Sequence, residues 1–305
     1  MNILGTEIDK KGDTLTVKHS KFLAFSPAYT FFIREMADLI DDKNAHPFTT
    51  WEDNNTEIIW VELEKKIVGI LCYNKEYVNA PWPFLAITLT ATHKDFRQRG
   101  IHTIMNKYFE NRAANLGCLG IRATVNVNNS VRLITAKKDN LHEMLRVYSR
   151  MIDPNEITNN DTLVQGPVKL LDSPIKEEFS NFLKEEQDRL TSLGYDRTIS
   201  KGILDIKSDE MDIIWTEENN RVTGFIGYVI SKVKHRVISN VFIYSDKHLE
   251  DQLFNSLLKI ANSLNCACIY RTVGVKDSYS VNQSLDLKFE ENFRLLFKRV
   301  EHGKI

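Results

Sequence analysis

The hydrophobic and polar positions of this chain alternate in short runs, which predicts strands and amphipathic helices in one order that occurs twice. The strands predicted in the first half are Thr14–Phe25, Glu57–Glu64, Ile67–Tyr73, Phe84–Thr92, Gly120–Val127 and His142–Met151, and the helices are Ala28–Asp41 and Ile101–Leu116. The strands predicted in the second half are Leu163–Leu171, Asp212–Glu217, Arg221–Ile230, Arg236–Tyr244, Ala267–Val275 and Asn292–Val300, and the helices are Ile175–Leu193 and Leu249–Leu264. In each half a short helical stretch precedes the last strand. Strands and helices mixed in this order predict an α/β fold with a mixed sheet in each half.

An internal repeat supports two copies of one fold. The segment Ile58–Glu62 recurs 155 residues later as Ile213–Glu217. Further along, the repeat distance becomes 148 residues, so that Ser130 matches Ser278. We assign the difference of seven residues to extra residues of the first copy in the Tyr77–Pro83 region.

The boundary between the copies is predicted from a polar, turn-rich stretch that contains a proline. This linker covers residues 153–162. The first domain is then residues 1–152 and the second domain is residues 163–305.

A basic turn joins the predicted strand Phe84–Thr92 to the predicted helix that begins at Ile101. The turn contains Lys94, Arg97, Arg99 and Gly100. A helix N-terminus presents unpaired N–H groups and a partial positive charge, so it readily binds anions. Glycine lets the backbone come close to a bound group. Together these features are typical of a pyrophosphate site.

On these residues the sequence resembles the GCN5-related N-acetyltransferase (GNAT) superfamily. Its signature, Arg/Gln-x-x-Gly-x-Gly/Ala, opens the central helix, and this chain reads Arg97-Gln98-Arg99-Gly100-Ile101-His102 after the aromatic Phe96. The resemblance covers roughly residues 14–152 and implies acetyl-CoA as acyl donor, with its pyrophosphate on the loop and its pantetheine and acetyl carbonyl along the preceding strand. The cofactor-binding residues it implies are Thr90, Ala91, Thr92, Arg97, Gln98, Arg99, Gly100, Ile101, His102, Thr103 and Asn129.

Three departures from the family pattern concern the signature and the acid–base groups. His102 replaces the small last residue of the signature, and Ala136 stands where a tyrosine often serves as general acid. The strand Phe84–Thr92 carries no carboxylate, although many relatives place a glutamate there. His93 and Tyr77 are the remaining catalytic candidates, the first because histidine titrates near neutrality. The alternatives are a turn histidine for His93 and an aromatic loop anchor for Tyr77.

The second copy is expected to have kept the fold and lost acetyl-CoA. At the repeat distance of 148, Ser245, Lys247 and His248 replace Arg97, Arg99 and Gly100, and Asp277 replaces Asn129. A turn without glycine and followed by acidic side chains is a poor cradle for a pyrophosphate. Tandem GNAT proteins with one working and one degenerate copy are known, and this chain resembles them.

Composition narrows the function. The 40 Lys and Arg against 41 Asp and Glu give a net charge of −1, which argues against a nucleic-acid-coating protein. We find no signal-peptide pattern and no apolar run near the ~20 residues that span a bilayer, so we expect a cytoplasmic protein with no membrane partner. The four cysteines fit neither a disulfide framework nor a zinc site, and no metal is expected.

The sequence therefore predicts an acyl-CoA-dependent N-acyltransferase that transfers an acyl group, by direct attack, to an amine acceptor held between the two copies. One alternative is a non-catalytic module that binds CoA and a protein partner. A further alternative is acyl transfer to a nucleobase or nucleic acid, which the near-neutral charge disfavours.

Overall fold

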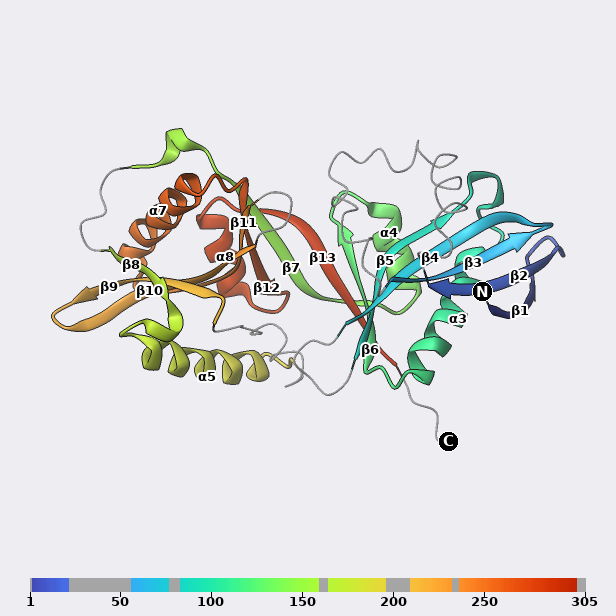
Figure 1. Cartoon of the computed structure of the whole chain (residues 1–305), viewed down its shortest axis with the longest axis horizontal. Coiled ribbons are helices and arrows are strands. Elements are labelled where there is room, and N and C mark those ends of the chain that lie inside the picture. Colours follow the sequence, from blue (N-terminus) through green and yellow to red (C-terminus); the bar gives the residue numbers. More distant parts are fainter. Residues whose placement is uncertain are drawn as a thin grey trace. The chain divides into compact units, whose positions relative to one another are not determined.

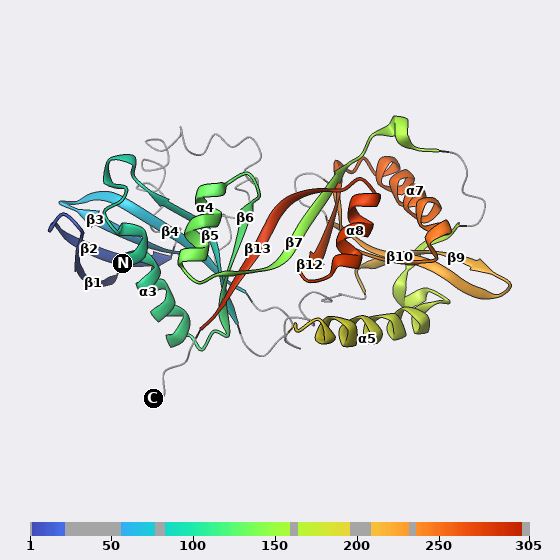
Figure 2. The ribbon, with the colours of Figure 1, turned by 180° about the vertical axis from the view of Figure 1, so that it is seen from behind.

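The computed structural model describes residues 2–21, 56–76, 83–158, 164–195, 209–231 and 236–300. The chain divides into two compact units, residues 1–142 with 295–305, and residues 143–294. Figures 1 and 2 show the elements of each unit from opposite sides. The predicted helix Ala28–Asp41 lies outside the described residues.

The first unit is built on a mixed sheet. Its strands follow the order β1 (Asn2–Ile8), β2 (Thr14–Lys21), β3 (Thr56–Leu63), β4 (Lys66–Glu76), β5 (Phe84–Thr92), β6 (Gly120–Asn126) and the end of β13 (Glu290–Arg299). Neighbours from β1 to β5 pair antiparallel, and β5 pairs parallel with β6. The helical elements are the turn η2 (Lys94–Phe96), α3 (Ile101–Asn115) and α4 (Ser130–Lys138). The mixed α/β class is confirmed, and β1 is a strand that the sequence pattern did not predict.

The second unit repeats this plan. Its sheet follows the order β7 (His142–Met151), β12 (Cys268–Gly274), β11 (Val237–Ser245), β10 (Arg221–Ser231), β9 (Met211–Glu218) and β8 (Val164–Lys169). The α-helices described in it are α5 (Lys176–Ser192), α7 (Lys247–Ser263) and α8 (Ser278–Asp286), and the 3-10 turns are η3 (Pro154–Glu156) and η4 (Leu170–Asp172). Both helices predicted for this half are confirmed.

Helix α3 packs on the first unit's sheet through the apolar face that the sequence predicts. Ile101, Met105 and Phe109 are buried in one core with Leu71 of β4 and Leu85 of β5. The burial of this face fixes where α3 begins, and so places its N-terminus beside the end of β5.

The repeat is visible at the level of element boundaries. The bounds of β4 and β10 differ by 155 residues at both ends, and those of α4 and α8 differ by 148 at both ends. Between them the register equates Thr92 with Ser245, because each is the partner of the same repeat glycine, Gly69 or Gly224.

This register corrects the assignment of the seven extra residues. The connection from β4 to β5 is residues 77–83 and that from β10 to β11 is residues 232–236, a difference of only two. Eight residues, His93–Gly100, separate Thr92 from Ile101, whereas three, 246–248, separate Ser245 from Leu249. Most of the extra length thus belongs to the β5–α3 loop itself. The placement in the Tyr77–Pro83 region was wrong because sequence matching without strand register cannot locate a gap.

The last strand of each sequence copy lies in the unit that the other copy mainly forms. β7 ends the first copy but lies in the second unit, and the end of β13 closes the second copy but lies in the first unit. β7 pairs antiparallel with β12 in the second unit, and Tyr148 is buried in that unit's core. Leu296 and Val300, at the end of the chain, are buried in the first unit's core. The contact-based units therefore differ from the sequence boundaries 1–152 and 163–305 at these two strands.

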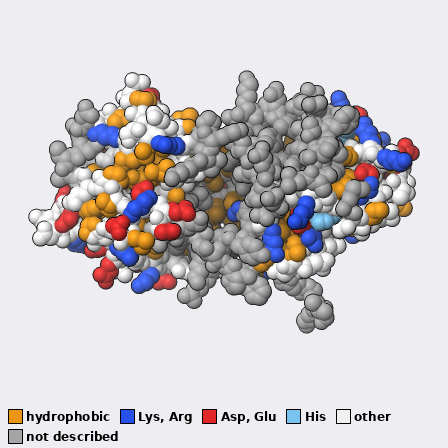
Figure 3. Space-filling model, in the orientation of Figure 1, with side chains coloured by type: hydrophobic (Ala, Val, Ile, Leu, Met, Phe, Trp, Pro, Cys, Tyr) orange, Lys and Arg blue, Asp and Glu red, His pale blue; other side chains and the backbone are white. Residues whose placement is uncertain are grey.

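The charge on the surface and the polarity of the helices say little more about the function. Basic and acidic side chains are interspersed on the face shown in Figure 3. Among the described helices, none combines the length and apolar character that a membrane span requires.

Candidate functional site

The β5–α3 loop has the backbone of an anion-binding turn. Gln98 has φ of 63° and Gly100, the N-cap of α3, has φ of 85°, so two residues of the loop adopt the left-handed region. Gly100 offers no side-chain cap to α3. The first N–H groups of α3 therefore remain open to an external acceptor, and the turn directs them to one place.

Three exposed cations surround this turn. Lys94 and Arg97 have exposed side chains and form no ion pair with a described residue. Lys10, from the β1–β2 turn, packs against the loop, since its Cγ and Cε lie 3.7 Å from where a Cβ on Gly100 would be. Sequence spacing could not reveal Lys10, because it is far from the loop along the chain.

Arg99, by contrast, is buried and forms ion pairs with acidic residues of the β1–β2 turn. It is 7% exposed, its Nε donates to Asp9 Oδ2 at 2.5 Å, and its Nη2 pairs with Asp13. The backbone N–H of Lys10 also donates to the Arg99 carbonyl at 3.2 Å. Burial raises the pKa of Asp9, but hydrogen bonds from Asp13 and Lys11 and the guanidinium of Arg99 outweigh it, so the pKa is lowered and Asp9 stays ionised. Arg99, which the sequence predicts to bind phosphate, thus holds the β1–β2 turn against the loop.

His93 fixes the first turn of the loop. It is 3% exposed, its Nδ1 accepts a hydrogen bond from the Asp95 N–H at 3.3 Å, and its own N–H donates to the Val68 carbonyl at 2.9 Å. Its ring packs edge-on to Phe96, with centroids 5.4 Å apart. These contacts support a capping role for this catalytic candidate. The other candidate, Tyr77, lies outside the described residues.

The residues in the first turn of α3 differ in whether their side chains can reach a ligand. Ile101 is buried in the core, so only its backbone can face a ligand, whereas Thr103 is exposed. His102 Nε2 lies 2.8 Å from Asp139 Oδ2 and 3.0 Å from Asn106 Nδ2. The ring that departs from the family signature is therefore held toward the end of α4.

The end of β5 presents polar atoms to the α3 side of the sheet. Thr90 pairs with Leu71, which packs in the α3-facing core, so both face that side. The Oγ1 atom of Thr90 is buried and has no hydrogen-bond partner in the described part of the chain. The register shifts between Ile87 and Leu89, so Thr88 is the extra residue of a bulge that redirects the strand end.

Arg132 is a site residue that the sequence analysis missed. Its Nη1 and Nη2 atoms are buried and have no hydrogen-bond partner among the described residues, where the closest acid is Asp139, at 4.0 Å. Burial lowers the pKa of Arg132, because the cation has lost water without gaining a close partner. Asn106 Oδ1, on the facing helix, is likewise buried and unpartnered. The available signal was the position of Arg132 four residues before the buried Ala136, on the inner face of α4.

Asn129 and Ala136 define the start and the interior of α4. Asn129 is the N-cap, and its Oδ1 accepts from the Arg132 N–H at 3.0 Å. Ala136 is fully buried in the core. The position at which relatives carry a tyrosine therefore offers no titratable group.

A second polar cluster lies toward the C-terminal part of α3. Glu57 Oε2 accepts from the Tyr73 hydroxyl at 2.7 Å, lies 2.8 Å from His19 Nε2, and lies 3.2 Å from Arg112 Nη2. Burial raises the pKa of Glu57, but hydrogen bonds from His19 and Tyr73 and the charge of Arg112 outweigh it and bring the pKa to about 2. Since the Glu57 carboxylate has three partners within the cluster, the cluster supports stability rather than ligand binding.

Thiols and metals do not add to the site. Cys72 is fully buried, which raises the pKa of its thiol and leaves it unreactive. No three His, Cys, Asp or Glu side chains in the described parts of the chain converge as a metal site would require.

The second unit lacks the loop. β11 ends at Ser245, and α7 begins at Lys247, with Asp246 alone between them. The N-cap is conserved in geometry, since Asp277 accepts from the Ser280 N–H at 3.1 Å as Asn129 does from Arg132. The cap is present in both units, but Asp246, the single residue between β11 and α7, has φ of −62° and so forms no left-handed turn.

Comparison with known proteins agrees with this geometry. The Acetyltransferase (GNAT) family model matches residues 24–135, a range that includes the β5–α3 loop and most of α4. No curated protein matches the sequence. A GCN5-related N-acetyltransferase from Sphaerobacter thermophilus superposes with a TM-score of 0.59 at 10% identity, over 95% of this chain and 97% of its own. A tandem GNAT protein from the clavulanic acid biosynthesis pathway, in a structure without AcCoA, superposes with a TM-score of 0.53 at 9% identity, over 95% of this chain and 100% of its own.

These findings define the class of protein: two consecutive mixed-sheet units with the GNAT fold, the first of which carries the GNAT loop. Residues 24–135 match the family model, and the fold of the whole chain is similar to that of solved GNAT proteins, one of them a tandem protein. This family and fold support N-acyltransferase activity in general.

Proposed function

We propose that the first unit binds acetyl-CoA and transfers its acyl group to an amine. The observation that carries this proposal is the left-handed Gly100 turn, which opens the N-terminus of α3 to an anion among exposed cations. A pyrophosphate on this turn would accept from the backbone N–H groups of Ile101, His102 and Thr103. Lys94, Arg97 and Lys10 would supply the neutralising charge.

The unpartnered buried atoms support the same ligand. Thr90 Oγ1, Asn106 Oδ1 and the Arg132 guanidinium are polar atoms that burial should penalise unless a partner binds them. An amide-rich chain such as pantetheine has both donors and acceptors for them. Because Thr90 and Arg132 belong to β5 and α4, they would hold the donor beside the strand end.

The chemistry needs few groups from the protein. The amine nitrogen attacks the thioester carbonyl carbon, the C–S bond breaks, and CoA leaves as a thiol once it has taken a proton. Backbone N–H groups near Thr90, Ala91 and Thr92 would polarise the carbonyl. With Ala136 at the tyrosine position, that proton comes from water or from a group outside the described residues.

One observation favours a second candidate, a module that binds CoA without catalysis. The His93 ring caps a turn and Ala136 carries no acid, so neither of these two positions offers a free acid or base. The β5–α3 loop would bind CoA in the same way in an acyltransferase and in a non-catalytic module.

Release of CoA from acetyl-CoA in the presence of amine pools separates the two. We expect release that depends on both substrates and falls in an Arg97→Ala variant, which leaves the fold's buried ion pairs intact. Binding of acetyl-CoA with no release from any amine pool would favour the module, and absence of binding would exclude both.

A further inference from the structure

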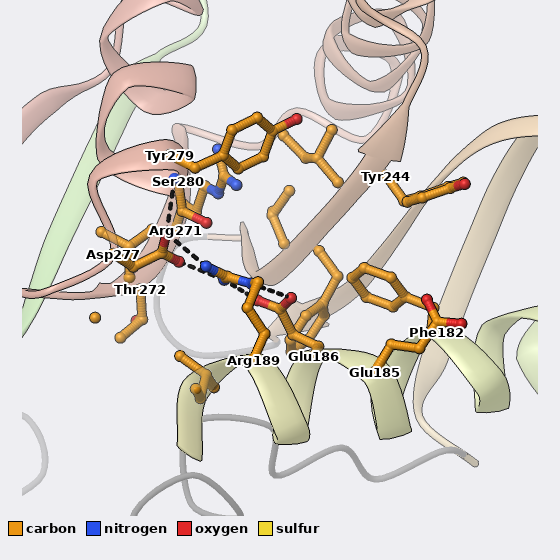
Figure 4. Close-up of a pocket in the computed structure, with 16 residues that line it drawn as sticks. Phe182, Glu185, Glu186, Arg189, Tyr244, Arg271, Thr272, Asp277, Tyr279 and Ser280 are labelled. Atoms are coloured by element: carbon orange, nitrogen blue, oxygen red, sulfur yellow. Dashed lines mark hydrogen bonds and ion pairs between the residues drawn. The ribbon is translucent and has the colours of Figure 1, made fainter. Parts of the chain in front are cut away.

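The second unit contains a cavity that the proposed function does not use. It has a volume of about 310 Å³ and lies among β11, β12, α5 and the start of α8 (Figure 4). β11 and β12 pair at Ile238 and Ile269, and the cavity is lined by residues closer to their C-terminal ends. This volume suits a molecule the size of a single amino acid or a small aromatic acid.

One wall of the cavity is aromatic. Phe182 of α5 and Tyr244 of β11 lie with ring centroids 5.7 Å apart, and Tyr279 of α8 lines the opposite side. Tyr244 and Tyr279 are 48% and 62% exposed, which is unusual for rings that already border a hollow. Such a wall would pack against an apolar or aromatic body.

The charge in the wall that lacks a counter-ion is Arg271. This side chain is 4% exposed and lines the cavity. Its Nη1 donates to Ser284 Oγ at 3.2 Å and its Nη2 to Gln283 Oε1 at 2.5 Å, so both hydrogen-bond partners are neutral. No carboxylate of the described residues lies within ion-pair distance of it, and burial lowers the pKa of Arg271 to about 10.

Two of the acids near Arg271 are already neutralised. Arg189 binds Asp277 through both Nη atoms, at 2.8 and 2.6 Å, and also pairs with Glu186. Glu250 acts on Arg271 only at longer range, and burial raises the pKa of this carboxyl. Glu185 lines the cavity from an exposed position on α5. A buried guanidinium without a paired acid is costly unless an anion binds it.

The fold itself does not require an arginine at this position. At the repeat distance of 148, the residue of the first unit that matches Arg271 is Ala123, which is buried in that unit's core. The same β-strand position is thus filled by a methyl group in one copy and by a cation in the other. Gln283, which accepts from Arg271, also hydrogen-bonds Glu250. A buried cation whose hydrogen-bond partners are neutral, at a strand position that the fold can fill with alanine, indicates an anionic ligand.

We propose that this cavity binds a small carboxylic acid with an aromatic or apolar body, with its carboxylate on Arg271 and its body against Phe182, Tyr244 and Tyr279. A planar carboxylate matches the geometry of the guanidinium. The site is separate from the β5–α3 loop, so it stands independently of the acyl-CoA proposal. A free acid and an amino acid share the carboxylate that the site selects.

The test uses three probes that share one body: 3-phenylpropanoate, L-phenylalanine and 2-phenylethylamine. Calorimetric titration into the full-length chain should detect the propanoate, with the amine weaker by about tenfold or more because it has no group for Arg271. Binding of L-phenylalanine as well as the propanoate would identify an amino acid as ligand source, and binding of the propanoate alone would identify a free acid. No binding of either carboxylate, or tighter binding of the amine, would overturn the proposal.

Variants locate the binding. An Arg271→Met change should weaken carboxylate binding by about tenfold or more, whereas Lys184→Gln, at an exposed position of α5 outside the cavity lining, should leave propanoate binding unchanged. If Arg271→Met fails to fold, hydrogen exchange of the wild-type chain gives the answer. The propanoate should protect amides of β12 and α8, and protection elsewhere with none there would overturn the proposal.

Discussion

At the scale of single residues, the two arginines of the loop signature have different surroundings. Arg97 is exposed, whereas Arg99 is buried and paired with Asp9 and Asp13. We expect Arg97→Met to weaken acetyl-CoA binding and to make that binding less dependent on salt concentration. The unfolding temperature should stay unchanged. Arg99→Met should lower the unfolding temperature, because it leaves the buried Asp9 carboxylate without its cation. Thermal unfolding and titration of both variants check this, and equal unfolding temperatures would refute the distinction.

A substitution of Thr90 tests acetyl-CoA binding without an expected loss of stability. Its Oγ1 is buried without a partner, so Thr90→Val should leave the free energy of unfolding unchanged or slightly higher. If pantetheine uses that hydroxyl, the same variant should bind acetyl-CoA about fivefold more weakly, or worse. Denaturant unfolding together with calorimetric titration measures the two quantities. A loss of stability without loss of affinity would show that the hydroxyl serves the fold.

Glu57 links a single carboxylate to the pH dependence of stability. Its pKa of about 2 lies below the ordinary value of 4.5, so the folded state binds a proton less readily than the unfolded state. Its contribution to stability is therefore complete above pH 4.5 and is lost as the pH falls toward 2. We expect Glu57→Gln to flatten the unfolding free energy across this interval, measured by urea unfolding at several pH values. A wild-type slope retained in Glu57→Gln would assign the acid sensitivity to other groups.

At the scale of elements, sequence periodicity predicts much of each unit because burial alone determines which faces are apolar. Helix α3 and strands β4 and β5 follow the apolar pattern closely. The partners of Arg99 could not be predicted, because Asp9 and Asp13 are 90 and 86 residues away and belong to a turn between strands, the first of which, β1, was not predicted. Arg132 was missed for a different reason: a cation in the first turn of a helix is ordinarily solvated, and only packing shows that it is buried. The location of the repeat's gap needed the strand register.

The glycines at the two ends of α3 provide a matched pair for the loop. Gly100 has φ of 85° and Gly117 has φ of 66°, so alanine at either position should cost about 1–2 kcal/mol through the same backbone strain. A Cβ on Gly117 would meet nothing within 4 Å, which makes Gly117→Ala a clean control. Only Gly100→Ala should also weaken acetyl-CoA binding, because it alters the turn that presents the α3 N–H groups. Equal affinities in the two variants would place the pyrophosphate elsewhere.

At the scale of the whole molecule, each unit is completed by a strand from the other copy of the repeat. Leu296 is 4% exposed and lies in the core of the first unit, although it follows the whole second copy in sequence. Leu296→Ala should lower the unfolding free energy by about 2–4 kcal/mol, through lost burial and the cavity left behind. Hydrogen exchange should rise in α3 of the first unit. If exchange rises only in α7 of the second unit, the assignment of this strand is wrong.

The central claim is that one unit of the two, the one with the β5–α3 loop, binds acetyl-CoA. Calorimetric titration of acetyl-CoA into the full-length chain tests it most directly, because the stoichiometry counts the sites. The account predicts one molecule per chain and a loss of binding in Gly100→Ala but not in Gly117→Ala. A stoichiometry of two, or no binding by the folded chain, would contradict it.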